Sequence, residues 1–127
     1  MNIFGIGTDI ISIDRLSKSL KSKNFIKRIF NEKEILKCKK TNKSANCFAK
    51  RFAAKEAFSK ALGTGIAKGI NFNEIIILNK KSGKPYINFI GQTKKTLNKK
   101  FKGKKSRISL SLSDEKKYAV AFVAISI

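Results

Sequence analysis

The sequence predicts an α+β fold, with helices gathered in the first half of the chain and hairpin strands in the second. Three observations carry this prediction. Residues 44–62 form the longest helical pattern and stop at a glycine, while residues 72–90 and 108–127 each contain two apolar runs around a polar turn. With 127 residues, 42% of them hydrophobic, the chain can bury one core, so we expect a single domain over 1–127 with an antiparallel sheet.

The first expected element is a strand over residues 2–10. Its hydropathy alternates loosely, and it contains Gly5 and Gly7, which suggests that another part of the backbone comes close. Asp9 lies at the end of this strand, where no local role explains a carboxylate.

Three short segments follow. A helix is expected over 12–21, with the serine at its first position as N-cap and with a basic outer face. Residues 25–30 predict only a short turn of apolar and basic residues. A second helix is expected over 31–39, because Asn31 followed by Glu34 matches a capping box.

The longest helix begins after a polar loop, with Ser44 as its expected N-cap and Gly63 in the C-cap position. The pattern of the remaining residues predicts, in order, a buried strand over 72–78, a turn, a strand over 85–90, a basic helix over 93–102, and a hairpin of strands over 108–113 and 118–127.

The composition limits the possible partners and compartments. A net charge of +21 favours an acidic partner, and nucleic acid, an anionic membrane surface and an acidic protein all fit, as does a composition bias without a binding role. No apolar run is long enough to cross a bilayer, so we expect a cytoplasmic protein. Cys38 and Cys47 lack metal-site spacing and have no histidine to share a site with, and in a cytosolic chain they are expected to be reduced thiols without a role.

The residue types present restrict the chemistry. The chain has no histidine, which excludes Ser-His and Cys-His nucleophiles and any zinc site with His ligands. Carboxylates, lysines and hard metal ions remain. Most acids are explained by their position: helix first turns account for Asp14, Glu32 and Glu34, a hairpin turn for Asp114 and Glu115, and a strand start for Glu74.

Asp9 and Glu56 are the two acids without such an explanation. Glu56 shares a helix stripe with Phe48, Ala49 and Phe52, so it faces inward or into a cleft. One interpretation is a salt bridge to Lys60, four residues later. The other is a Mg²⁺ site made by both acids, because Mg²⁺ needs only one or two protein carboxylates and completes its shell with water and substrate phosphate. In that case Arg51, Lys55 and Lys60 would hold phosphate oxygens.

Four motifs resemble those of one family. They are GIGTDIISIDRL at 5–16, RFAAKEAFSKALGTGI at 51–66, GKP at 83–85 and LSLSDEKKYAVA at 110–121. In this order and spacing they resemble the holo-acyl-carrier-protein synthases, the small bacterial branch of the 4′-phosphopantetheinyl transferases, along essentially the whole chain. The resemblance implies a phosphopantetheinyl transferase domain with an antiparallel sheet and a long central helix.

The resemblance also implies a reaction and its catalytic residues. Phosphopantetheine would pass from coenzyme A to a serine of apo acyl carrier protein, leaving 3′,5′-ADP, in support of fatty acid biosynthesis. Asp9 and Glu56 match the family's Mg²⁺ ligands on the coenzyme A pyrophosphate. Glu56 would take the serine proton directly or through a water, and Lys60 would stabilise or protonate the leaving phosphate.

Further coenzyme A contacts are implied for a second group of residues, namely Arg51, Lys60, Gly63, Thr64, Gly65 and the loop lysine Lys43. From the residues alone, a simple helix stop is the favoured explanation of the GTG at 63–65, and a loop that approaches phosphate is the alternative. One position departs from the family: many relatives have a histidine where this chain has Asp114, and a carboxylate cannot make that histidine's phosphate contact.

The family resemblance finally implies partners. The protein is expected to form a homotrimer with active sites between subunits and to dock an acidic acyl carrier protein on its first helix. The docking residues would be Arg15, Lys21, Phe25 and Arg28. Neither nucleic acid nor membrane insertion is part of this expectation.

Two other function classes fit the sequence less well. A basic nucleic-acid-binding or ribosome-associated protein would explain the charge, but Phe48, Phe52, Phe58 and Phe122 occupy positions typical of a core rather than of an exposed stacking platform. A binding module without activity would have no need for Asp9, Glu56 and Lys60 together.

Overall fold

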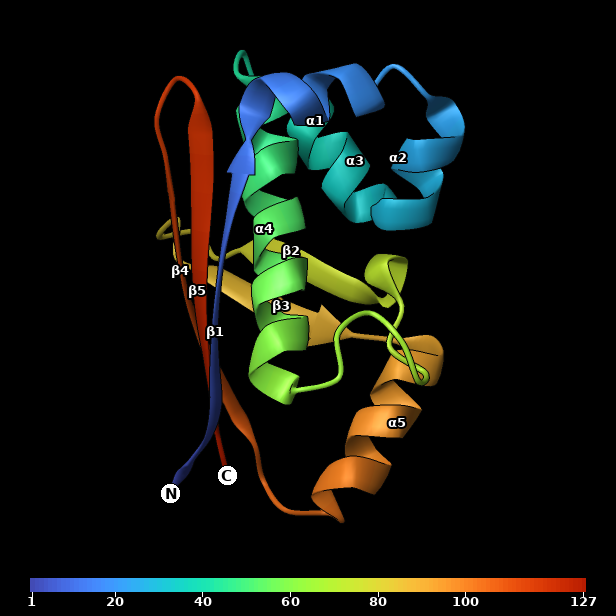
Figure 1. The fold of residues 1–127 in the computed structure, drawn as a ribbon, viewed down its shortest axis with the longest axis vertical. Coiled ribbons are helices and arrows are strands. Elements are labelled where there is room, and N and C mark those ends of the chain that lie inside the picture. The colour runs from blue at the N-terminus through green and yellow to red at the C-terminus, as the bar shows by residue number, and fades with distance from the viewer.

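The computed structural model describes residues 1–127 and confirms the α+β class (Figure 1). None of its helices has the length and apolar character needed to span a membrane. In chain order the elements are β1 (Ile3–Ser12), α1 (Ile13–Ser19), α2 (Lys23–Ile29), α3 (Glu32–Lys39), α4 (Ser44–Leu62), the 3₁₀ helix η1 (Phe72–Glu74), β2 (Ile75–Asn79), β3 (Pro85–Phe89), α5 (Gly91–Phe101), β4 (Arg107–Asp114) and β5 (Tyr118–Ser126).

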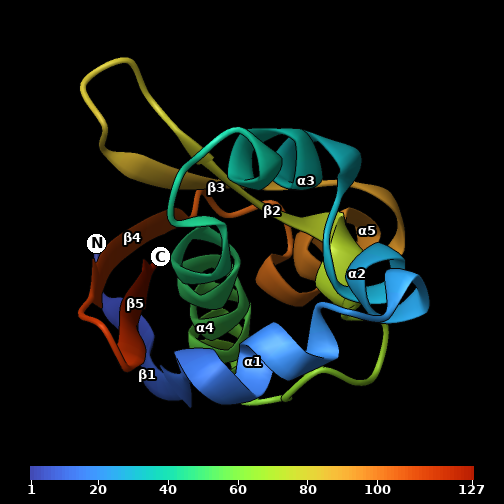
Figure 2. The same ribbon diagram turned by 90° about the horizontal axis from the view of Figure 1, so that it is seen from above.

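The long helix α4 lies at the centre of the molecule, with the three-stranded sheet along one side and the β2–β3 hairpin along an adjoining side, next to β4 (Figure 2). The sheet is antiparallel in the order β1-β5-β4, and the separate hairpin pairs β2 with β3. Alternate residues of each strand point towards α4, and in β5 these are Ala119, Ala121, Val123 and Ile125, all fully buried. The sheet therefore presents one packed face and one outer face.

Gly5 and Gly7 allow β1 to lie against the backbone of α4. A Cβ atom added at Gly5 would be 1.9 Å from the carbonyl oxygen of Ala61, and one at Gly7 would be 2.0 Å from that of Ala57. These atoms belong to the helix backbone and cannot rotate away, so only glycine fits at both positions. The predicted close approach of another backbone segment is confirmed, and it occurs in the first half of the strand.

A second, smaller core lies where α1, α2 and α3 pack against one end of α4. Its buried side chains include Ile13, Leu16, Ile29, Phe30 and Phe48. This core fixes the three short helices beside the N-terminal half of α4, at the end of the molecule opposite to the C-terminus of α5 (Figure 1).

Most of the predicted elements are found. Ser12 caps α1 by accepting a hydrogen bond from the amide of Arg15, the capping box of Asn31 and Glu34 is present, and Gly63 ends α4 with φ of +87°. Ser44 does not cap α4 as expected, because it is already the first helical residue and Lys43 precedes it without a side-chain cap.

The expected turn over 25–30 is wrong, since this segment belongs to α2. Ser22 caps this helix by accepting a hydrogen bond from the amide of Phe25. The core position expected for Phe122 is also wrong, because this residue lies on the outer face of the sheet and is 45% exposed.

The two cysteines are not free thiols in the structure. Cys38 of α3 and Cys47 of α4 form a disulfide, with Cα atoms 5.3 Å apart. The expectation rested on a cytosolic compartment, which does not specify how the two residues pack: the short loop after α3 folds the chain back, so that they face each other in the smaller core.

Candidate functional site

The two unexplained acids lie on facing elements. Asp9 stands on the inner face of β1, opposite the half of α4 that carries Glu56 and Lys60. The Nζ atom of Lys60 donates to Asp9 Oδ1 and to the carbonyl oxygen of Thr8, each at 3.0 Å. Lys60 therefore pairs with Asp9 across the two elements, and the alternative salt bridge to Glu56 along the helix is absent.

The Glu56 carboxylate is half-buried, and its pKa is raised above the ordinary value of 4.5. Burial is the main cause, the negative charge of Asp9 adds to it, and the charge of Lys60 partly opposes it. The charge of Asp9 thus disfavours that of Glu56, and a bound cation would relieve this repulsion.

This pair fits Mg²⁺ in number and in chemistry. The structure contains no group of three or more acidic, histidine or cysteine side chains suited to a metal ion, so the pair would supply the protein ligands alone. That is the usual situation for Mg²⁺, which retains water and binds substrate phosphate. Asp9 and Glu56 are the residues that would hold it.

Lys55, the neighbour of Glu56 in the sequence, does not reach the site. Its side chain is fully buried and points to the other side of α4, where Nζ lies 2.7 Å from Glu34 Oε1 and donates to the carbonyl oxygens of Phe72 and Ile75. The expected phosphate contact of Lys55 is therefore wrong. Burial lowers the pKa of Lys55 to about 8, with the charge of Glu34 opposing this shift.

Glu34 has two structural roles, and only its role in the capping box was predicted from the sequence. It accepts from the backbone amide of Asn31 as part of the capping box, and its other oxygen accepts from the amide of Ile77 at 3.1 Å. Together with Lys55, this buried carboxylate joins α3, α4 and β2. The ion pair was missed because a capping role already accounted for Glu34.

A basic pocket of about 590 Å³ lies at the N-terminal half of α4, beside the β2–β3 turn. Arg51 and Lys43, both expected to contact coenzyme A, line it. Arg51 is 4% exposed and donates to Asn79 Oδ1 at 2.7 Å, but its buried Nε atom has no partner. Burial lowers the pKa of Arg51, against the charge of Glu34. An anionic group is the natural partner for such a guanidinium.

Asp114 lies at the mouth of the same pocket. Its carboxylate accepts from Asn46 Nδ2 at 2.7 Å and lies 3.4 Å from the Nζ atom of Lys50. The hydrogen bond from Asn46 is the main cause of its lowered pKa, with burial opposing and Lys50 assisting. The carboxylate is thus charged and already engaged, so it contributes to holding a lysine beside the pocket.

Within one chain, the basic pocket and the acidic pair lie on different faces of α4. Arg51 and Glu56 are five residues apart, which places their side chains about 140° apart around the helix axis. The structure therefore brings Asp9, Glu56 and Lys60 together and leaves Arg51 and Lys43 elsewhere.

The glycines after α4 support the helix-stop interpretation of GTG. Gly63 is the C-cap residue, and Gly65 also has positive φ, +67°, with its amide donating to the carbonyl oxygen of Ser59. Thr64 is half-buried, and its hydroxyl donates to the Gly65 carbonyl. No side chain or backbone lies within 4 Å of the position of an added Cβ at either glycine, so the segment is open to approach. A coenzyme A contact here stays a prediction.

The residues expected to dock a carrier protein lie on α1, the following turn and α2. Arg15, Lys21 and Arg28 are exposed, and Phe25 is half-buried. The Arg28 guanidinium lies 5.9 Å from the centre of the Phe25 ring, which in turn stacks against Phe52 of α4 at 6.4 Å. A cationic surface with an aromatic inset is thus present.

This fold and this pairing of acidic and basic residues on a glycine-bearing strand and a long helix define a known superfamily. The model of the 4′-phosphopantetheinyl transferase superfamily matches residues 5–123, and the chain belongs to this family.

Its relatives are more specific. The chain is 50% identical over 125 residues to the holo-[acyl-carrier-protein] synthase of Pelagibacter ubique (strain HTCC1062), covering 98% of each protein. Its structure resembles the crystal structure of the holo-[acyl-carrier-protein] synthase from Neisseria meningitidis, with a TM-score of 0.88, 41% identity and coverage of 98% of this chain and 99% of the other. It also resembles the Helicobacter pylori synthase in complex with coenzyme A, with a TM-score of 0.79, 35% identity and coverage of 95% and 99%.

Proposed function

We propose that this protein, acting as a single domain over 1–127, transfers 4′-phosphopantetheine from coenzyme A to a serine of apo acyl carrier protein, giving holo carrier and adenosine 3′,5′-bisphosphate. The relatives named as synthases and the relative bound to coenzyme A support this activity. The proposal includes a cytoplasmic location, dependence on Mg²⁺ and a role in fatty acid biosynthesis.

One observation carries the proposal within the molecule. Asp9 and Glu56, from two separate family motifs, meet across β1 and α4 with Lys60 beside them. Two carboxylates and one ammonium group are the charges that a phosphoryl transfer needs near its reacting atoms.

Asp9 and Glu56 would hold Mg²⁺, which when bound supplies charge neutralisation at the coenzyme A pyrophosphate. Glu56 would also accept the proton of the carrier serine while the serine oxygen attacks the β-phosphorus of coenzyme A in line with the leaving group. Lys60 would turn from Asp9 to the phosphate that leaves with adenosine, stabilising its growing negative charge.

The basic pocket would bind the adenosine phosphates of coenzyme A. Arg51 and Lys43 both line this pocket, and Lys43 is exposed to solvent. Contacts of the Gly63–Gly65 segment, including Thr64, with coenzyme A belong to the same proposal, because the segment is open and begins three residues after Lys60.

The proposal includes a homotrimer with active sites between subunits, and two features support it. The outer face of the sheet exposes apolar side chains of β1 and β5, namely Ile6, Ile10, Tyr118, Val120 and Phe122. The basic pocket and the acidic pair also face different directions in one chain, so one coenzyme A would reach both sets more readily between two copies. A Phe122→Asp variant should be monomeric and poorly active by sedimentation and transfer assays, whereas a trimeric, active variant would contradict this assembly.

The acidic carrier protein would dock on Arg15, Lys21, Phe25 and Arg28. Charge complementarity would speed the encounter and make it sensitive to salt. The first experiment is the intact mass of apo carrier after incubation with this protein, coenzyme A and Mg²⁺, beside a chelator control. A metal-dependent gain of one phosphopantetheine group is expected. No gain with several carriers would overturn the proposal and direct attention to nucleic acid as the partner of the basic surface.

A further inference from the structure

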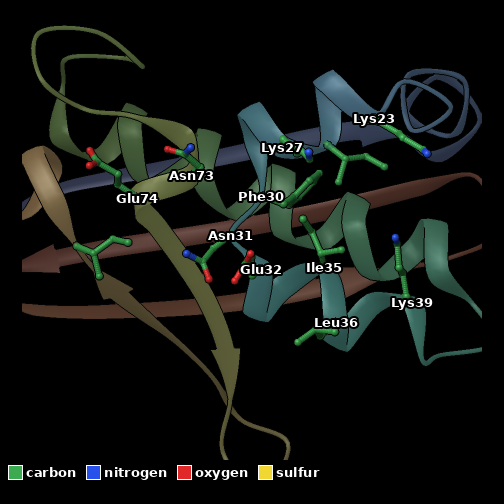
Figure 3. Close-up of a pocket in the computed structure, with 12 residues that line it drawn as sticks. Lys23, Lys27, Phe30, Asn31, Glu32, Ile35, Leu36, Lys39, Asn73 and Glu74 are labelled. Carbon is green, nitrogen blue, oxygen red and sulfur yellow. The ribbon is translucent and has the colours of Figure 1, made fainter.

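An open groove of about 1100 Å³ lies between α2 and α3, with η1 and the residue after β3 also lining it. Figure 3 shows Lys23 and Lys27 extending from α2 on one side of the groove and Leu36 and Lys39 from α3 on the other. None of the residues assigned above to catalysis, coenzyme A or carrier docking lines it.

The floor of the groove is apolar and accessible. Ile26, Phe30 and Ile35 form its inner part, with Phe30 only 2% exposed. Leu36 is 60% exposed and Ile90 40% exposed, so two large apolar side chains that line the groove are open to solvent. Exposed apolar side chains that share one groove are typical of a surface that binds a partner.

The rim of the groove is basic and its cations are free. None of Lys23, Lys27 and Lys39 takes part in the three salt bridges of the molecule. Of the two acids at the groove, Glu74 is already engaged: its carboxylate accepts from Asn71, from the amide of Gln92 and from Thr93. These partners are neutral, so Glu74 keeps its negative charge. Three lysines therefore face two carboxylates, Glu32 and Glu74, and the excess of positive charge favours an acidic ligand.

We propose that this groove binds an acidic amphipathic segment of the same carrier protein, as a second contact beyond the docking surface on α1 and α2. This inference rests on the proposed function, which requires an acidic protein partner at this end of the molecule. Apolar side chains of the segment would lie on Leu36 and Ile90, and its carboxylates would meet the lysines of the rim.

The position of α2 makes the two contacts continuous. This helix forms a ridge whose outer surface carries Lys23, Lys27 and Arg28. Phe25, on one flank, belongs to the docking surface, and Ile26, on the other flank, belongs to the groove. A partner that contacts Arg28 therefore needs only to extend across the width of α2 to enter the groove.

Two groove variants and one matched control test the proposal. Leu36→Asp places a charge on the exposed apolar floor, and Lys27→Glu reverses a rim charge. Lys99→Glu makes the same reversal on α5, at the opposite end of the molecule, and corrects for the general loss of positive charge (Figure 1). All three positions are exposed, so each variant is expected to fold.

The readouts are the KM for apo carrier, the KM for coenzyme A, and direct binding of a carrier whose acceptor serine is replaced by alanine. Leu36→Asp and Lys27→Glu should each raise the KM for carrier and weaken direct binding by about fivefold or more, with the KM for coenzyme A unchanged. Lys99→Glu should change each value by less than about twofold.

Groove variants that match Lys99→Glu in carrier KM and in direct binding would overturn the groove contact while leaving the proposed function intact. A wild-type protein that transfers nothing to any carrier would instead overturn the proposed function itself. A variant that loses affinity for coenzyme A as well as for carrier would show that the groove supports the fold rather than the carrier, and it would also overturn the proposal.

Discussion

Lys60 on α4 holds Asp9 on β1, with 3.0 Å between its ammonium nitrogen and the carboxylate oxygen. The contact keeps the carboxylate at the face of the helix that carries Glu56. A metal ion would therefore compete with Lys60 for the Asp9 carboxylate, and a substrate phosphate would compete with Asp9 for the Lys60 ammonium group. We therefore regard the pair as a resting arrangement that coenzyme A and Mg²⁺ would open together.

Replacing Glu56 with glutamine tests its role in the reaction. The substitution keeps the shape of the side chain and removes the charge that would bind metal and accept the serine proton. We expect the transfer rate to fall by about 10²-fold or more, with a circular dichroism spectrum like that of the wild type. Transfer at the wild-type rate would show that Glu56 is neither metal ligand nor base.

The raised pKa of Glu56 should also be visible when the stability of this variant is compared with that of the wild type at different pH values. Because the folded-state pKa lies above the ordinary 4.5, the folded protein holds its proton longer than the unfolded chain does, and stability falls as pH rises through this interval. In chelator at pH 7, Glu56→Gln should melt at a higher temperature than the wild type, and the difference should vanish below about pH 4. A Glu115→Gln control, in the exposed hairpin turn, should not reproduce this pattern.

Replacing Lys55 with methionine leaves Glu34 buried without its cation. An uncompensated buried charge costs about 3–5 kcal/mol, so urea unfolding should show a loss of that order. Lys50→Met, which breaks the more exposed pair with Asp114, should cost less than about 1 kcal/mol. Adding Glu34→Gln to Lys55→Met should restore part of the loss, and equal costs for the two single lysine variants would argue against the buried pair.

The pairing of Cys38 with Cys47 can be checked by mass. Alkylation of the unfolded protein without reductant should add no label, whereas alkylation after reduction should add two. A cross-link over nine residues contributes about 3 kcal/mol in the chain-entropy model, so reduction should lower the melting temperature. Two labels without reductant would restore the free thiols that the sequence suggested.

The sequence predicted the acidic pair because elimination works well in a chain with only eight acids. Asp9 and Glu56 had no local task, and the structure places them across β1 and α4. Lys55 could not be assigned in the same way. The helix α4 is buried on several sides, so its pattern does not distinguish the face towards the sheet from the face towards Glu34.

Other errors have different physical origins. The helix α2 has only seven residues and a weak pattern, although Ser22 was a cap signal that could have revealed it. Phe122 alternates like a core residue, because a sheet with two apolar faces gives no sign in its sequence of which face is covered. The disulfide depends on how two helices pack, which spacing alone does not specify.

The pairing of β1 with β5 has a consequence for the order in which the molecule gains activity. Asp9 lies in the first strand and is paired with Ala121 of the last, so its position depends on a contact between very distant parts of the sequence. Such contacts form slowly and cannot form before the last strand has left the ribosome. Helices α1 to α4 can assemble earlier, during synthesis. The active site would then be completed only in the last step of folding, when β1 pairs with β5.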